Sequence, residues 1–308
     1  MLKAVLIAAA LVSASHALAQ RAAPEDACKA RNATVDERLA GCTALIESNR
    51  ETGRSLAMAY CNRGFALTEK RELDRALTDL NQAIKLDPGL ACPYSNRGRV
   101  FVFKGDLDHA IADYDTAIKI DPKLAVAYNN RGDALIHRKQ FDRAIADFSL
   151  AIKLDPHSIH AYGNRAWAFQ LKRDYKSALA DYGTAISLQP SDLLGYINRG
   201  NVYRSMGDLD HAAADYGQAI KVAPNDARGW RNRGLIRLMK YDNAGGIADY
   251  NKAIMLDPAD ADSWNNRAIA RRDSGDRAGA ITDFKKALEI NPDLPSTRQL
   301  LQQLGVNP

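Results

Sequence analysis

One 34-residue pattern occurs seven times in succession, from residue 57 to residue 294, without an insertion or a deletion between copies. A fixed period of this length is typical of repeat proteins, in which each copy buries its apolar face only against its neighbours. The period therefore outweighs the estimate of about two domains that length alone would give. Its clearest mark is a series of prolines 34 residues apart: Pro88, Pro122, Pro156, Pro190, Pro224, Pro258 and Pro292.

Each copy reads as two amphipathic helices joined by a tight turn. In the second helix, Ala110, Tyr114 and Ile118 recur at the spacing of one buried helical face. An Asp-Pro pair such as Asp121-Pro122 then breaks the helix. The fourth position is aromatic in every copy: Tyr60, Tyr94, Tyr128, Tyr162, Tyr196, Trp230 and Trp264. A small residue follows four places later: Gly64, Gly98, Gly132, Ala166, Gly200, Gly234 and Ala268.

This pattern resembles the tetratricopeptide repeat family, whose positions 4, 8, 20, 24, 27 and 32 favour an aromatic, a small residue, Ala, an aromatic, Ala and Pro. The resemblance implies an all-α, right-handed α-solenoid in which the first helices of the pairs line a concave groove. One departure is an arginine at position 7 in every copy. The predicted repeats are 57–90, 91–124, 125–158, 159–192, 193–226, 227–260 and 261–294.

Residues 1–19 read as a secretory signal peptide. Lys3 supplies the positive start, an apolar run from Ala4 to Val12 follows, and Ala17 and Ala19 form the small-x-small cleavage pattern. The apolar run is too short for an ordinary transmembrane helix. A retained anchor or a buried first helix is the alternative. We expect cleavage after Ala19 and a periplasmic or secreted protein.

The four cysteines fit an exported protein, because they are even in number and an oxidising compartment favours disulfides. Three pairings are possible. We favour Cys28–Cys42, which closes a short segment, and Cys61–Cys92, which would join the opening helices of two neighbouring repeats. Four buried thiols remain an alternative. A zinc site is disfavoured, because no C-x-x-C motif or nearby histidine pair accompanies the cysteines.

The segments that flank the repeats read as caps. Residues 20–56 form an N-terminal cap, in which Val35 to Glu47 resembles a degenerate second helix. Residues 295–308 form a C-terminal capping helix that we expect to begin with a capping box from Ser296 to Gln299 and to stop at Gly305. Such caps cover the apolar ends of a stacked array.

An arginine and an aspartate recur sixteen residues apart, one in each helix of every copy. This regularity predicts a structural ladder of ion pairs that joins the helices, worth about 3 kcal/mol per partner if desolvated and under about 1 if exposed. The arginines are Arg63, Arg97, Arg131, Arg165, Arg199, Arg233 and Arg267. The aspartates are Asp79, Asp113, Asp147, Asp181, Asp215, Asp249 and Asp283.

An asparagine precedes each arginine, on the helical stripe that we expect to face the groove. An amide offers both a donor and an acceptor, so it can pair with a peptide backbone of any sequence. The position also resembles the asparagine-lined groove of O-GlcNAc transferase, which implies an extended peptide along the concave face. The predicted peptide-binding asparagines are Asn62, Asn96, Asn130, Asn164, Asn198, Asn232 and Asn266.

The rest of the groove stripe varies, as expected of a selective surface, although a solvated face is the alternative. We predict an apolar first half with Phe65, Phe103, Trp167 and Leu171. We predict a basic second half with Arg204, Arg228, Arg231, Arg237, Arg271 and Arg272. This asymmetry would suit a protein or peptide partner with an acidic segment, unless these arginines only extend along a solvated edge.

No catalytic motif accompanies the repeats. The sequence has no phosphate-binding loop and no nucleophile elbow, and His137 and His160 lack a carboxylate at metal-ligand spacing. We expect no metal, no cofactor and no enzyme activity. A net charge of +5 is too small to favour a nucleic-acid partner. The favoured function is an interaction module of the cell envelope; the alternatives are a scaffold acting through its convex face and ends, and carbohydrate recognition through Phe65, Phe103 and Trp167.

Overall fold

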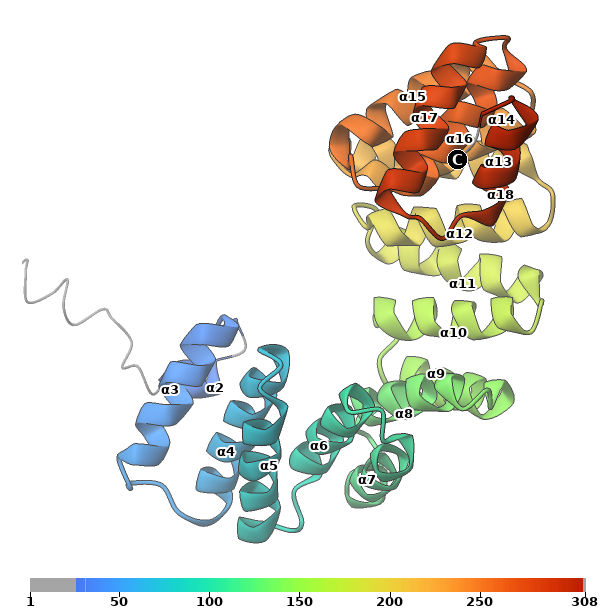
Figure 1. The fold of residues 1–308 in the computed structure, drawn as a ribbon. Helices are drawn as coiled ribbons and strands as arrows, with labels where there is room; N and C mark the ends of the chain where they lie inside the picture. Colours follow the sequence, from blue (N-terminus) through green and yellow to red (C-terminus); the bar gives the residue numbers. More distant parts are fainter. Residues whose placement is uncertain (1–25, 31, 307–308) are drawn as a thin grey trace, which may run out of the picture. The chain divides into compact units, whose positions relative to one another are not determined.

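The computed structural model describes residues 26–30 and 32–306, and within these ranges its regular elements are all helices (Figure 1). The predicted signal peptide lies outside the described residues. The described residues form two compact units, one up to residue 156 and one from residue 157 onward, and each is described by itself. In both units consecutive helices pair as neighbours, which confirms the predicted all-α solenoid of helix-turn-helix repeats.

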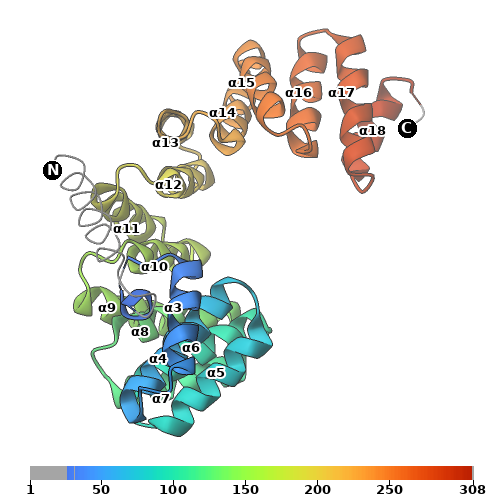
Figure 2. The ribbon, with the colours of Figure 1, turned by 90° about the vertical axis from the view of Figure 1, so that its left-hand side faces the viewer.

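The first unit holds the N-terminal cap and three helix pairs (Figure 2). The cap consists of α2 (Asp26–Lys29) and α3 (Val35–Glu47), and a capping box between Thr34 and Glu37 starts α3. The pairs are α4 (Gly53–Glu69) with α5 (Leu73–Leu86), α6 (Ala91–Phe103) with α7 (Leu107–Ile120), and α8 (Ala125–His137) with α9 (Phe141–Leu154).

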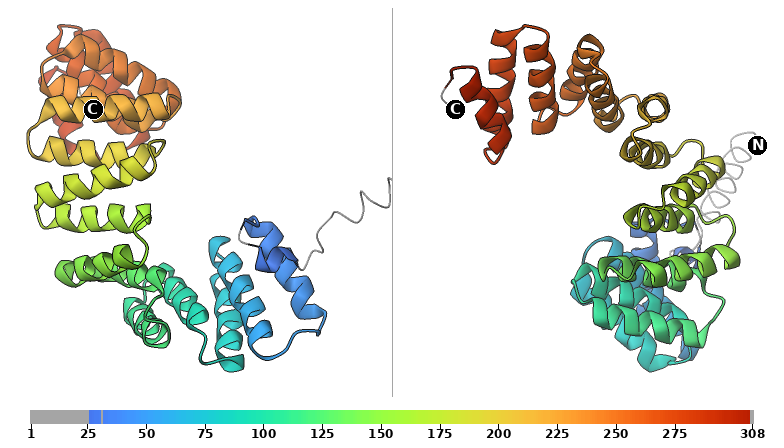
Figure 3. Two further views of the ribbon diagram at one scale, coloured as in Figure 1. Left: turned by 180° about the vertical axis from the view of Figure 1, so that it is seen from behind. Right: turned by 90° about the vertical axis from the view of Figure 1, so that its right-hand side faces the viewer.

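The second unit holds four helix pairs and a final helix (Figure 3). The pairs are α10 (Ile159–Leu171) with α11 (Tyr175–Leu188), α12 (Leu193–Ser205) with α13 (Leu209–Val222), α14 (Ala227–Met239) with α15 (Asn243–Leu256), and α16 (Ala261–Asp273) with α17 (Arg277–Ile290). Helix α18 (Pro295–Gln303) packs against α17 through buried Leu301.

A small residue in the first helix of a pair lets a large aromatic ring of the second helix approach the backbone. The clearest case is Gly132, where an added Cβ would lie 2.6 Å from Cε1 of Phe148. Phe148 is fully buried, as is Tyr114 at the same position of the preceding repeat. Replacing such a glycine by a larger residue would force these helices apart, which explains the small residue at the eighth position.

The turn within each pair uses a left-handed residue at the fifteenth position of the repeat. Glycine occupies it at Gly105, Gly207 and Gly275, which carry φ values of +78°, +81° and +86°. Lys139 and Tyr241 adopt the same conformation with φ values of +58° and +62°, although a side chain makes this region unfavourable. The tight turn was predicted from the sequence, but this left-handed conformation was not.

The predicted capping box at the C-terminal helix is wrong. Helix α18 begins after Leu294 with Pro295 in its first turn, and no side chain caps it. Proline suits that place because its missing N–H would have no helical partner there. Thr297 is buried and donates its hydroxyl to Oδ1 of Asn265 at 2.8 Å, so it ties α18 to α16.

Candidate functional site

The seven arginine–aspartate ion pairs are present. In the third repeat, Nε and Nη2 of Arg131 donate to the two carboxylate oxygens of Asp147 at 2.8 and 2.7 Å. The aspartate is 5% exposed, and hydrogen bonding to it raises the pKa of the Arg131 guanidinium. This bidentate geometry joins the two helices of a repeat.

Arg97, Arg131 and Arg267 also reach back to the preceding repeat, a contact that was not predicted. Nη1 of Arg131 donates to Oδ1 of Asp115 at 2.5 Å, and Nη1 of Arg97 donates to Oδ1 of Asn81 at 2.7 Å. Arg267 makes the same bond to Asn251 at 2.7 Å. In each of these bonds the acceptor stands sixteen residues before the arginine, a spacing that can be read in the sequence.

The structure joins Cys28 to Cys42 and Cys61 to Cys92, the pairing that the sequence analysis favoured. The first bond holds α2 against α3. The second bond links the first helices of two consecutive repeats, α4 and α6. In the described residues no cysteine is free.

The predicted asparagines fall into two groups. In the first unit, Nδ2 of Asn62 donates to the main-chain oxygen of Cys28 at 2.9 Å, whereas Nδ2 of Asn96 lies 3.3 Å from Sγ of Cys61. The amide of Asn130 neighbours Asn129, whose Nδ2 lies 3.5 Å from its oxygen. In the second unit, four asparagines line two surface cavities: Asn164, Asn198, Asn232 and Asn266.

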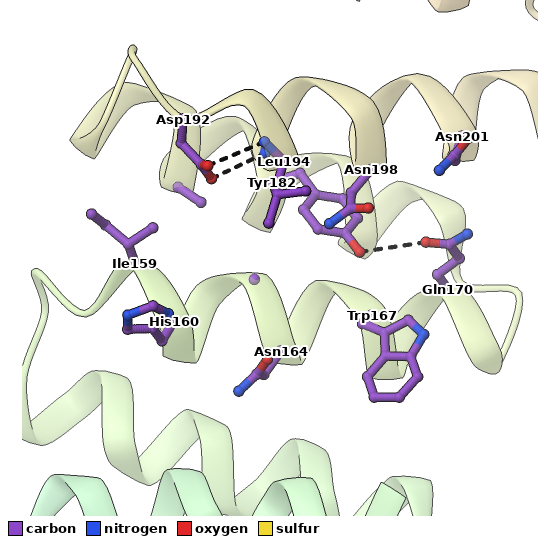
Figure 4. A pocket seen from close by; sticks show the side chains of 13 residues that line it. Ile159, His160, Asn164, Trp167, Gln170, Tyr182, Asp192, Leu194, Asn198 and Asn201 are labelled. Carbon is purple, nitrogen blue, oxygen red and sulfur yellow. Dashed lines mark hydrogen bonds between the residues drawn. The ribbon is translucent and has the colours of Figure 1, made fainter. Parts of the chain in front are cut away.

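The first cavity has a volume of about 460 Å³ and lies between the helix pairs of repeats four and five (Figure 4). Amide side chains from both repeats line it, together with the ring of Tyr182, whose hydroxyl donates to Oε1 of Gln170 at 3.4 Å. Burial raises the pKa of Tyr182 further above its ordinary value, and its protonated hydroxyl can donate as well as accept a hydrogen bond. The amides are Asn164, Gln170, Asn198 and Asn201.

Apolar side chains border the same cavity. Trp167 is 37% exposed, and Leu194 is 47% exposed. The indole N–H of Trp230 donates to the main-chain oxygen of Pro224 at 3.0 Å, and Trp264 bonds in the same way to Pro258. Across the described residues, no such bond holds the indole N–H of Trp167, which leaves it able to contact a ligand.

The second cavity has a volume of about 360 Å³ and shares Asn201 with the first. Three arginines line it, as predicted for the basic half of the groove, but two of them are neutralised. Arg228 pairs with both carboxylate oxygens of Asp226 at 2.9 and 2.8 Å, and Arg231 pairs with Asp260 at 3.3 Å. Arg204 forms no hydrogen bond or ion pair with the described residues, so it carries the available positive charge of this cavity.

Of the three other arginines assigned to the basic half, Arg272 pairs with Asp273 at 2.8 Å, and the other two belong to the ion-pair ladder. Nη1 of Arg237 lies 3.0 Å from the buried carboxylate of Asp249, and Nη1 of Arg271 lies 2.8 Å from that of Asp283. Each is a second cation on an aspartate of the ion-pair ladder. Neither lines a cavity of the groove, because position 11 of the repeat faces the packing side of the first helix.

In the first unit, arginines lie against the two aromatic rings that were predicted for the apolar half of the groove. The guanidinium carbon of Arg71 lies 3.7 Å from the ring centre of Phe103, and that of Arg99 lies 5.4 Å away. Arg99 also lies 5.6 Å from the ring centre of Phe65 and forms an ion pair with Glu69. Cation–π contacts therefore occupy these two rings, which weakens the case for them as carbohydrate platforms.

The chain consists of stacked helix pairs, with an arginine–aspartate ion pair in each repeat and cavities along the first helices. These features define a class of protein, the helical repeat modules that carry binding surfaces. Family models described as tetratricopeptide repeat match residues 57–90, 125–158, 159–192 and 261–294, and one described as TPR repeat matches 98–137 and 200–240. The chain therefore belongs to the tetratricopeptide repeat family. Proteins with this fold generally act as non-catalytic modules that bind other proteins or peptides.

Solved structures share the fold at low sequence identity. A chain of the APC/C hetero-tetramer Cut9-Hcn1 is 19% identical with a TM-score of 0.64; the match covers 88% of this chain and 52% of that one, so this chain spans about half its length. A tetratricopeptide repeat protein from Parabacteroides merdae is 18% identical with a TM-score of 0.59, covering 81% and 99%. PilF of Pseudomonas aeruginosa is 17% identical with a TM-score of 0.60, covering 69% and 97%. A search of the curated proteins found no match.

Between residues 26 and 306, position 31 excepted, no helix combines the length and the apolar character that a membrane span requires. In the same ranges, no group of three or more histidine, cysteine, aspartate or glutamate side chains is placed to hold a metal ion.

Proposed function

We propose that this protein is a non-enzymatic interaction module of the cell envelope, which binds an extended peptide or a segment of a partner protein in the groove of its second unit. The observation that carries the proposal is the bond from Nδ2 of Asn62 to the main-chain oxygen of Cys28. One asparagine of the series thus holds a peptide carbonyl within this chain. Asn164, Asn198, Asn232 and Asn266 stand at the same repeat position and line cavities large enough for a ligand.

The two cavities would recognise different side chains of the same bound ligand. The asparagine amides would form hydrogen bonds with the main chain of the ligand whatever its sequence, because each amide offers a donor and an acceptor. Beside the first cavity, Trp167 and Leu194 favour an apolar ligand side chain. In the second cavity, Arg204 favours an acidic one, since its guanidinium has no partner among the described residues. The bound segment would therefore carry an apolar residue followed or preceded by an acidic one.

Selection from a random peptide library, followed by affinity measurement on the oxidised chain, tests the main-chain contribution. We expect the double substitution Asn164→Ala and Asn198→Ala to weaken selected peptides at least tenfold, since two hydrogen bonds are lost. Asn96→Ala is the matched control, because its amide faces the sulfurs of Cys61 and Cys92. Unchanged affinity in the double variant would defeat the proposal.

The acidic preference has its own test. Arg204→Gln should remove the preference for acidic peptides and reduce the salt dependence of their binding, because a screened charge pair is lost. Lys221→Gln is the control, since Lys221 is an exposed residue of α13 that lines neither cavity. Equal salt dependence in both variants would argue against a role for Arg204.

Localisation in the periplasm or outside the cell is part of the proposal and rests on the predicted signal peptide. Cell fractionation and N-terminal sequencing of the native protein test it. We expect a mature chain that begins at Gln20. A cytosolic protein with residues 1–19 intact would contradict this part of the proposal and leave the groove unaffected.

One observation favours a scaffold function: large apolar side chains are exposed at the turns of repeats five and six. Tyr241 is 90% exposed, Met206 50% and Met239 46%. Tyr241 also takes an unfavourable left-handed conformation that glycine would adopt without cost, so neither packing nor backbone geometry explains a tyrosine there. Crosslinking in the native envelope separates the two functions: the scaffold predicts loss of the crosslink in Met206→Ser, Met239→Ser and Tyr241→Ser, with the groove variants unaffected.

A further inference from the structure

The groove position of the first repeat is already occupied by the chain itself. Helix α2 ends beside α4, where the main-chain oxygen of Cys28 accepts the amide of Asn62 at 2.9 Å. Lys29 lines a cavity of about 470 Å³ together with Met58 and Asn62. Met58 and Asn62 are the second and sixth residues of the repeat, the positions that His160 and Asn164 hold beside the first cavity of the second unit. The N-terminal segment therefore takes the place of a ligand.

Contacts with α3 and α4 hold this segment in place, and Cys28 is fully buried in a core cluster with Cys42, Leu45 and Ala59. The Cys28–Cys42 disulfide ties it to α3, and Nη2 of Arg38 donates to the main-chain oxygen of Ala30 at 2.9 Å. Nζ of Lys29 pairs with Glu51 at 2.9 Å, but the lysine is largely exposed. A helix of four residues has no stability of its own, so the segment depends on these contacts, of which the disulfide is the covalent one.

We propose that residues 26–30 are an autoinhibitory occupant of the first repeat, and that the Cys28–Cys42 disulfide keeps Asn62 from an external ligand. A dithiol reductant would cleave the Cys28–Cys42 disulfide by thiol–disulfide exchange: the Sγ–Sγ bond breaks, two thiols form, and the dithiol becomes a disulfide. Both sulfurs are buried, so the exchange follows local opening of α2. The inference rests on the main-chain recognition in the proposed function.

The second disulfide gives a matched comparison. Cys61–Cys92 joins α4 to α6, two helices that belong to neighbouring repeats, and cleaving it leaves α2 attached. Only the first disulfide should therefore control the segment. Two double variants remove the bonds separately: Cys28→Ala with Cys42→Ala, and Cys61→Ala with Cys92→Ala. Comparing them distinguishes release of residues 26–30 from a general loss of stability.

Hydrogen exchange measured by mass spectrometry tests whether Asn62 holds the segment. In the oxidised chain, Asn62→Ala should raise the exchange rate of residues 26–30 about fivefold, the equivalent of one ordinary hydrogen bond. Loss of Cys28–Cys42 should raise it at least tenfold while exchange in the repeats stays the same. Asn96→Ala and loss of Cys61–Cys92 should leave the segment unchanged. A segment insensitive to Asn62→Ala would overturn the inference.

A peptide of the chain's own sequence tests whether the vacated site binds. The probe is a fluorescein-labelled peptide of residues 24–33 with Cys28→Ala. We expect it to bind the full chain lacking Cys28–Cys42 at least tenfold more tightly than the oxidised chain, and to lose that binding when Asn62→Ala is added. Equal binding to all three proteins would overturn the inference. Because the second-unit groove is tested by Asn164→Ala and Asn198→Ala, failure here and failure of the proposed function are separate results.

Discussion

Asp147→Ala is the sharpest test of the ion-pair ladder. The carboxylate is 5% exposed and accepts two hydrogen bonds from Arg131, whose side chain is 18% exposed. Removing one partner of a buried pair costs about 3–5 kcal/mol. Because Arg131 keeps Asp115 as a partner at 2.5 Å, we expect the lower end, about 3 kcal/mol. This corresponds to a fall in melting temperature of about 6–12 °C for a unit of this size.

Asp115→Ala provides the matched control, since Asp115 binds the same guanidinium but its side chain is 53% exposed. Its loss should cost under about 1 kcal/mol. Urea unfolding followed by circular dichroism gives the stability, and hydrogen exchange in α8 and α9 assigns the loss to the third repeat. Equal losses in the two variants would refute the argument that burial, rather than charge alone, gives the ladder its strength.

Three further predictions concern single residues. Gly217→Asn should raise the stability of the second unit by about 1 kcal/mol, because it places an amide oxygen sixteen residues before Arg233, where an added Cβ meets no atom within 4 Å. Asp133→Asn should stabilise the chain at pH 7 and lose that advantage below about pH 4: burial raises the pKa of Asp133, so its carboxylate destabilises the folded state until falling pH protonates it. Tyr241→Gly should raise stability by about 1 kcal/mol by relieving a left-handed side-chain residue.

Each of these predictions has a measurement that can contradict it. For Gly217→Asn, a lower melting temperature would show that no new bond to Arg233 forms. For Asp133→Asn, urea midpoints that differ from the wild type by the same amount at pH 4 and pH 7 would rule out titration as the cause. For Tyr241→Gly, the control is Gly207→Ala, which should shift the melting temperature in the opposite direction.

The repeat itself was the most predictable part of the molecule. A strict period, a small residue opposite an aromatic ring and a terminal proline specify helix pairs, because each choice agrees with the same packing. The arginine–aspartate pairs were also predictable, since both partners recur at fixed positions. The turn conformation was not, because Arg71, Lys139, Arg173 and Tyr241 occupy a backbone region that sequence reasoning reserves for glycine.

The groove was harder to predict because neighbouring side chains decide which charges remain available. Arg228 and Arg231 read as basic groove residues, yet Asp226 and Asp260 neutralise them, whereas Arg204 has no such neighbour among the described residues. Phe65 and Phe103 likewise each lie against an arginine of a neighbouring repeat, Arg99 and Arg71 respectively. The helical wheel places a residue on a stripe, but these pairings depend on how the repeats stack.

The arginine that reaches back sixteen residues also sets how stiffly consecutive repeats are coupled. At Arg199 and Arg233 the residue at that spacing is a glycine, Gly183 or Gly217, so the side-chain link to the preceding repeat is missing. In a solenoid each repeat is coupled only to its neighbours, so these two junctions of the second unit are held by fewer side-chain contacts. The first cavity is lined by repeats four and five and the second by repeats five to seven, so a ligand seated in them would bridge these two junctions and supply contacts between repeats that glycine omits.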